Sequence, residues 1–144
     1  VRILVSLSIT SLASMFDMCT TCNANLNSWD ISGITTIPTM FAGATNFNQP
    51  LNNWDVSNVT DIRALFANAT SFNQPLDNWD VSGVNMMHQM FDSATSFNQN
   101  LGSWQLDSVG IILRMLDHSG LSVQNYDSTL IGWHNQNFLA WLVS

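Results

Sequence analysis

The chain has 144 residues, an apolar fraction of 46% and a formal net charge of −7, from ten acidic residues, all Asp, against three Arg and no Lys. One domain with a core of its own is expected at this length. The negative charge argues against nucleic acid and against electrostatic docking to anionic lipid, which both call for a basic surface, and no apolar run is long enough to span a membrane.

The first residues, VRILVSLSITSLASMF, combine one basic residue with an apolar run, as a signal peptide does. They also match the following segment position by position, so we interpret them as a degenerate first repeat in preference to a signal peptide. The matching pairs are Ile9 and Ile34, Leu12 and Ile37, Met15 and Met40, and Phe16 and Phe41. The initial Val is compatible with processing or with a longer parent protein.

A 25-residue repeat organises the chain that follows. Residues 51–75, LNNWDVSNVTDIRALFANATSFNQP, match LNSWDISGITTIPTMFAGATNFNQP before them and LDNWDVSGVNMMHQMFDSATSFNQN after them. A constant period of this length is typical of stacked repeats. We expect five coils, of which the fifth decays, and they begin at Leu4, Trp29, Trp54, Trp79 and Trp104.

The predicted fold class is α/β, a leucine-rich-repeat-like solenoid over residues 1–120. Within one coil, the alternation of Trp54 and Val56 predicts a short parallel strand. The spacing of Val59, Ile62 and Leu65 predicts a short helix with one buried face. Equivalent residues then lie above one another, so that Asn23, Asn48, Asn73 and Asn98, for example, are expected to bond the backbone of the next coil.

Residues 121–144 are expected to form a C-terminal cap helix and an apolar tail. Ser122 is the candidate N-cap, and Gly132 is a weak breaker within the helix. The apolar positions of the helix are Val123, Tyr126, Leu130 and Trp133. The tail, residues 138–143, is expected either to fold onto the cap or to contact a partner.

The repeat resembles the BspA-like leucine-rich-repeat surface proteins. The resemblance is carried by FNQPLNNWDVSNVTDI, by the following Met-Phe or Leu-Phe pair, by A-T-S-F-N-Q, and by the closing LSVQNYDSTLIGW. It covers residues 9–133 and departs in the first coil, which has Leu4 and Val5 in place of Trp-Asp. The resemblance implies a solenoid that is secreted or displayed on bacterial or protist surfaces and serves adhesion or protein binding, with no shared catalytic residues.

Cys19 and Cys22 form a C-x-x-C pair at positions where the other coils have Ala and Phe. Because both positions belong to the expected core, buried thiols are favoured. A local disulfide is the alternative, and redox chemistry is less favoured because no second C-x-x-C or nearby His completes a site.

Three further ranks carry functional alternatives. The carboxylates of Asp30, Asp55 and Asp80 are predicted to bond their own turns in preference to calcium, for which the neighbouring ranks offer too few oxygens. The Trp rank is predicted to be core in preference to an exposed ladder that stacks on sugars. The Thr rank resembles a narrow ice-binding face, although Thr also suits a turn; it consists of Thr20, Thr45, Thr70 and Thr95.

The expected function is a non-enzymatic extracellular or cell-surface interaction or adhesion module, which binds a protein or glycan through one solenoid face. A structural subunit packed end to end in a filament or larger assembly is the alternative, and ice binding is a minor one. Variation inside a strict repeat shows where packing does not dictate identity, so the variable ranks are the expected partner-facing surface. The candidate residues are Arg63, His88, Gln89, Arg114 and Trp141. No catalytic residue, metal or cofactor is expected.

Overall fold

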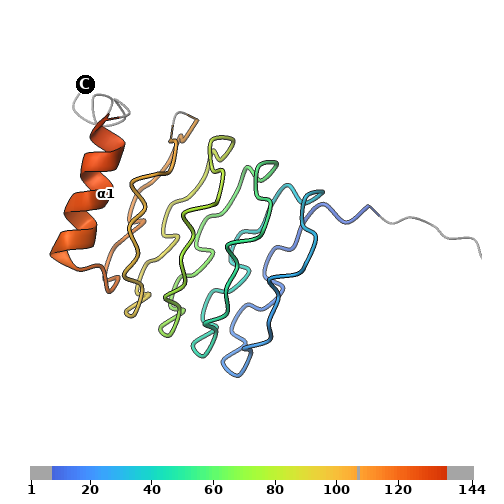
Figure 1. Ribbon diagram of the computed structural model, residues 1–144. Coiled ribbons are helices and arrows are strands. Elements are labelled where there is room, and N and C mark those ends of the chain that lie inside the picture. Colours follow the sequence, from blue (N-terminus) through green and yellow to red (C-terminus); the bar gives the residue numbers. More distant parts are fainter. Residues whose placement is uncertain (1–7, 107, 136–144) are drawn as a thin grey trace, which may run out of the picture.

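The computed structural model describes residues 8–106 and 108–135 (Figure 1). They form a stack in which each coil lies beside the equivalent part of the preceding repeat, and α1, Val123–Asn135, covers the last coil. Isolated parallel bridges mark the register from coil to coil and involve Ser11, Thr36, Asp61, Met86 and Ile111. The uninterrupted period of the sequence therefore becomes a vertical alignment of equivalent residues.

The predicted α/β solenoid is wrong. The described residues contain one α-helix, which belongs to the cap, and their strand pairing does not go beyond isolated bridges, so no sheet forms. In each coil the expected helix is replaced by six consecutive turn residues, which we call the turn run. The turn runs are residues 13–18, 38–43, 63–68, 88–93 and 113–118.

The hydrogen bonds of the turn run explain why no helix forms. In the third coil, alternate N–H groups from Ile62 to Asn68 donate to carbonyls of the fourth coil, from Met86 to Asp92, at 2.8–2.9 Å. Between them, the N–H groups of Leu65 and Ala67 donate three positions back in their own coil, both at 3.2 Å, and that of Arg63 donates to the Asp61 side chain at 3.1 Å. Alternate N–H groups therefore leave the coil, whereas an α-helix would keep them within the segment.

Left-handed residues complete the turn run. Ala64 has φ of 49° and Asn68 has φ of 57°, and equivalent residues in every other coil share this conformation. A positive φ at the third position of a β-turn is what a type II turn requires, and it interrupts a right-handed helix. The apolar spacing nevertheless gave the correct burial, because Ile62, Leu65 and Phe66 are fully buried.

The segment predicted as a strand makes no backbone hydrogen bond to a neighbouring coil among the described residues. Trp54 and Val56 are buried and Asp55 between them is exposed, as the alternation predicted. Side chains connect the coils here in place of a backbone ladder. The indole Nε1–H of Trp54 donates to the Leu26 carbonyl at 2.8 Å, and Trp79 and Trp104 repeat the bond one and two coils further on.

The core consists of stacked aromatic columns. Phe16, Phe41, Phe66 and Phe91 stack with ring centroids 5.5–5.7 Å apart. A second column, Phe47, Phe72 and Phe97, has spacings of 6.0 and 6.2 Å. The two columns also stack on each other within the second, third and fourth coils, at 3.8–4.1 Å. Offset aromatic pairs add to the stability gained from burial alone, so each coil is held to its neighbours along several columns.

The cap helix replaces a sixth coil. The Ser122 hydroxyl accepts from the Asn125 N–H at 3.3 Å, which confirms the predicted N-cap. Asn125 continues the Asn rank, because its amide donates to the carbonyl and side-chain oxygens of Asn98 at 2.8 and 2.9 Å. Trp133 takes the place of the next Trp by donating to the Leu101 carbonyl at 2.9 Å. No helix in the described part of the chain is long and apolar enough to cross a membrane.

The predicted apolar face of α1 is only partly correct. Trp133 is buried, but Val123 is 78% exposed and Tyr126 is 45% exposed. The helix also continues through Gly132, which was predicted to be a weak breaker. Gly132 lies against the backbone of Gly102, and a β-carbon at this position would collide with the Gly102 carbonyl oxygen. The glycine therefore serves the close approach of the helix to the coil.

Candidate functional site

A shallow hollow lies on the outer face of the fourth and fifth turn runs. It has a volume of ≈ 270 Å³ and is lined by His88, Gln89, Ile111, Leu113 and Arg114. Each turn run sends two adjacent residues to this face, and the register of the repeat places His88 beside Leu113 and Gln89 beside Arg114. Three of the five predicted partner-facing residues, His88, Gln89 and Arg114, thus meet at one place.

Exposed apolar side chains form much of the hollow. Leu113 is 71% exposed and Ile111 is 49% exposed. At the bridge position of Ile111 the earlier coils have Ser11, Thr36, Asp61 and Met86. The pair of exposed aliphatic side chains, Ile111 and Leu113, is therefore a feature of the fifth coil. Large exposed apolar residues that lie together mark a contact surface more often than residues that are scattered singly.

Asp92 fixes the polar rim of the hollow. Its carboxylate contacts the Arg114 guanidinium at 3.2 Å and His118 Nδ1 at 3.6 Å, and it accepts from Gln89 at 3.4 Å and from Ser93 at 3.2 Å. Burial tends to raise the pKa of Asp92, but the hydrogen bonds and the Arg114 charge outweigh it and lower the pKa below its usual value. The carboxylate therefore stays ionised near neutral pH and holds Arg114 at the rim.

His88 contributes a buried polar atom. Its Nδ1 is inaccessible to solvent and has no hydrogen-bond partner within the described residues. A buried polar atom without a partner is uncommon in folded proteins and is costly to maintain.

The other two predicted partner-facing residues are not part of this hollow. Arg63 lies one coil earlier, where its half-exposed guanidinium contacts the buried Asp61 carboxylate at 3.2 Å. Trp141 lies outside the described residues. Ile111 was missed as a site residue, although an apolar residue at a bridge position that is polar in three of the four earlier coils was a usable signal.

Comparison with known protein families identifies a relationship over most of the chain. The family model described as "Mycoplasma protein of unknown function, DUF285" matches residues 10–129. The chain belongs to this family. No curated protein and no solved structure matches the DUF285 chain. The resemblance to BspA-like proteins stays a prediction.

The Asp rank of this DUF285 chain bonds its own turns, as predicted. Asp30, Asp55 and Asp80 each accept from the backbone N–H of the Ser two positions on, at 3.0–3.1 Å, and from its hydroxyl, at 2.6–2.7 Å. The Ser hydroxyl and then the Ser N–H lower the pKa of each carboxyl. Within the described ranges, no group of three or more His, Cys, Asp or Glu is placed to hold a metal ion.

The Trp and Thr ranks have different environments. Trp54, Trp79 and Trp104 are at most 3% exposed, which confirms them as core, whereas Trp29 at the open end is 36% exposed. In the Thr rank, Thr45 and Thr70 are half-buried, and the Thr70 hydroxyl donates to the Thr45 carbonyl at 3.4 Å. This hydroxyl is therefore engaged with the backbone of the neighbouring coil.

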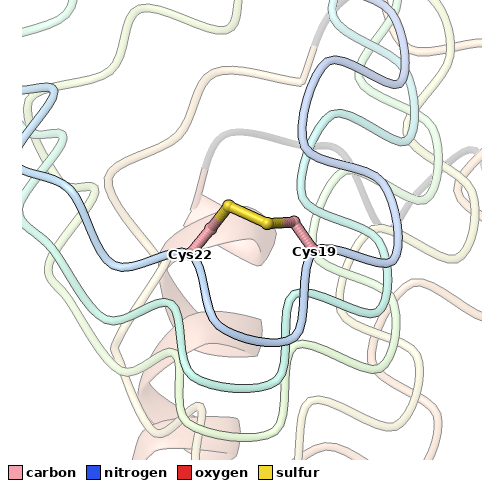
Figure 2. Close-up of a disulfide and its surroundings, with 2 residues drawn as sticks. All are labelled: Cys19 and Cys22. Carbon is pink, nitrogen blue, oxygen red and sulfur yellow. A yellow bond between two sulfur atoms is a disulfide. The ribbon is translucent and has the colours of Figure 1, made fainter.

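The predicted buried thiols are wrong. Cys19 and Cys22 form a disulfide, with Cα atoms 5.4 Å apart, across the tip of the first coil (Figure 2). Both side chains are half-buried because no earlier coil in the described chain covers this tip. The disulfide thus closes the turn that Ala and Phe close by packing in the other coils.

Proposed function

We propose that the chain is a non-enzymatic extracellular or cell-surface interaction module that binds a partner protein through the hollow at His88, Gln89, Ile111, Leu113 and Arg114. The observation that carries the proposal is the meeting of exposed Leu113 and Ile111 with a half-exposed Arg114 held by Asp92. An apolar centre with a polar rim is the usual composition of a protein interface, and Arg is enriched there.

The chemistry of the hollow favours a protein over a glycan. Its exposed side chains are aliphatic, whereas sugars are usually bound by aromatic faces and planar polar groups, and the indoles of Trp54, Trp79 and Trp104 are buried. One apolar side chain of the partner would fill the space between Ile111 and Leu113. A carbonyl or carboxylate beside it would accept from Arg114.

The disulfide of the first coil supports the proposed location. A disulfide persists in oxidising compartments, and Cys19–Cys22 is therefore consistent with a secreted or surface-displayed chain. The resemblance to BspA-like surface proteins favours the same role.

A binding comparison between two matched variants tests the proposal. Leu113→Asp places a charge in the hollow, and Val123→Asp places the same charge on α1 at a residue of similar exposure, 78% against 71%. The labelled chain is applied to arrays of extracellular proteins and of glycans. We expect protein ligands whose affinity falls at least about tenfold with Leu113→Asp, or ~1.4 kcal/mol, and stays unchanged with Val123→Asp. Binding confined to glycans, or equal loss in both variants, would contradict the proposal.

A structural subunit packed end to end is the second candidate. In the second to fifth coils, alternate carbonyls accept hydrogen bonds from N–H groups of the preceding coil. The equivalent carbonyls of the first coil receive no hydrogen bond from a described residue; they belong to Ser11, Ala13, Met15 and Asp17. The matching N–H groups of the last coil also lack partners in the described chain. The row of carbonyls on the first coil cannot bond to the same row of a second copy, because both rows only accept hydrogen bonds. Assembly through these edges would therefore join the first coil of one copy to the last coil of the next, head to tail. Light scattering over a range of concentrations tests it, and a mass that stays monomeric would exclude it.

A further inference from the structure

A polar hollow lies where the third and fourth coils end, on segments outside the turn runs. It has a volume of ≈ 390 Å³ and is lined by Pro75, Leu76, Asp77, Gln99, Asn100 and Ser103. None of these residues lines the hollow at Leu113. Ligand pockets usually have volumes of about 300–1,000 Å³, so the polar hollow is at the small end of that range.

The lack of a side chain at Gly102 opens the polar hollow. The equivalent residues of the two preceding coils are Asn52 and Asp77, and the Asn52 amide donates to the Asp77 carboxylate at 3.0 Å. Gly102 offers no such side chain to Asp77 from the next coil. Glycine is required here because a β-carbon would lie 2.8 Å from the Ser128 carbonyl oxygen of α1. The close seating of α1 therefore leaves the exposed Asp77 carboxylate accessible from the polar hollow.

Two amide side chains in the lining are held in place and keep one unused group each. The Asn100 side-chain oxygen accepts from the Gly102 N–H at 2.8 Å and from the Thr129 hydroxyl at 3.4 Å. These bonds leave the NH2 group of Asn100 as a donor without a partner among the described residues. The NH2 group of Gln99 donates to the carbonyl and side-chain oxygens of Asn73, at 3.2 and 2.8 Å, which leaves the Gln99 oxygen as an unused acceptor.

Asp77 and Ser103 add further unused groups. Among the described residues, the Asp77 carboxylate accepts from Asn52 through one of its two oxygens. In the two preceding coils, the N–H groups of Asn53 and Asn78 each donate to an Asn side chain of the coil before, at 3.2 and 3.1 Å. The equivalent N–H of Ser103 makes no bond to a described residue, and its hydroxyl donates to the Asp77 carbonyl at the long distance of 3.5 Å. Donors and acceptors therefore occur side by side in the polar hollow.

This mixture of groups matches the hydroxyl groups of a neutral sugar. A hydroxyl donates and accepts at the same time, so adjacent sugar hydroxyls can donate to the Asp77 carboxylate and accept from the Asn100 amide. Pro75 is exposed, and its ring offers an apolar surface to the C–H face of a sugar ring. The charged residue of the lining, Asp77, is negative and disfavours an anion. Calcium is disfavoured because it takes about six to eight oxygen ligands, more than this lining supplies.

We propose that the polar hollow binds a neutral sugar residue at the end of a glycan chain. The Asp77 carboxylate accepts from two neighbouring hydroxyls of the sugar, and the Asn100 amide donates to one of them. Gln99 accepts from a further hydroxyl, and the sugar ring lies against Pro75. This site is separate from the protein-binding hollow at Leu113, and neither site requires the other.

A titration of the full chain with free sugars, followed by NMR of its amide groups, tests the proposal. The probes are glucose, galactose, mannose and N-acetylglucosamine. We expect at least one of them to shift the side-chain amide signal of Asn100 and the backbone N–H signal of Ser103. The dissociation constant should be on the order of 1 mM, because a small ligand in an open site makes few contacts.

Conservative variants separate binding from folding. Asp77→Asn keeps an oxygen that can accept from Asn52 but removes the charged acceptor, and Asn100→Asp keeps the accepting oxygen but removes the donor. Each should weaken sugar binding at least about tenfold, as measured by the Ser103 signal. Asp17→Asn is the matched control, because it removes the same charge from an exposed residue of the first coil and should leave sugar binding unchanged.

Three results would overturn the inference. The first is that none of the four sugars shifts the signals of Asn100 and Ser103. The second is that Asp77→Asn and Asp17→Asn bind the sugar equally well. The third is that calcium chloride alone shifts the same signals, which would make the polar hollow a cation site. Leu113→Asp should leave sugar binding unchanged, so this inference and the proposed function fail separately.

Discussion

The Asn rank offers the sharpest test of what holds one coil to the next. The side-chain oxygen of Asn73 accepts from the Asn98 N–H at 2.8 Å and from the Gln99 amide at 2.8 Å. In Asn73→Ala, the half-buried Asn98 N–H loses its partner, which costs about 1–3 kcal/mol. Gln99 still donates to the Asn73 carbonyl, at 3.2 Å, so its own loss is smaller. We therefore expect a total destabilisation of about 2 kcal/mol.

Urea unfolding followed by Trp fluorescence measures this effect. A loss of about 2 kcal/mol at an unchanged slope lowers the midpoint by roughly 1 M. Asn73→Asp keeps the accepting oxygen and should retain most of the stability. Asn78→Ala, at an exposed Asn whose side chain makes no described bond, should stay within about 0.5 kcal/mol of the unaltered chain. The reasoning is refuted if the Asn73→Ala and Asn78→Ala midpoints coincide, or if Asp is as damaging as Ala.

Three further changes test the packing of the coils, each by the midpoint of thermal unfolding. Trp79→Phe removes the buried indole hydrogen bond and should lower the free energy of unfolding by about 1–3 kcal/mol. Trp29→Phe, at the exposed end of the stack, should lower it by less, and equal losses would contradict the stacked core. Gly132→Ala should destabilise by about 1–3 kcal/mol although Ala is the better helix former, and a gain would show that the cap is not tightly seated. Reduction of Cys19–Cys22, which closes a short loop, should cost about 2 kcal/mol, and an unchanged midpoint would contradict a closed disulfide.

The burial of the turn run could be predicted from the local sequence pattern, but its backbone conformation could not, because it depends on hydrogen bonds to the next coil. The apolar spacing correctly assigned Ile62 and Leu65 to the interior. It did not distinguish a helix from a run of turns, because both return a side chain to the same face after three or four positions. The destination of alternate N–H groups decided the outcome, and that destination lies in the next coil, as in the bond from Ile62 to Met86.

The candidate site shows the same division. Variation inside the repeat pointed to His88, Gln89 and Arg114 before their positions were known. The hollow, however, also depends on Ile111 and Leu113 of the next coil and on Asp92, which holds Arg114. These residues come from two coils, so their proximity depends on how adjacent turn runs align.

The sequence alone determined the period, the vertical ranks and the burial of their apolar members, because a repeat without insertions places identical residues in identical surroundings. The tertiary structure decided the conformation of each coil and the state of Cys19 and Cys22. The physical reason is that a backbone N–H has several acceptors of similar strength within reach, and which one it chooses depends on the coil packed against it.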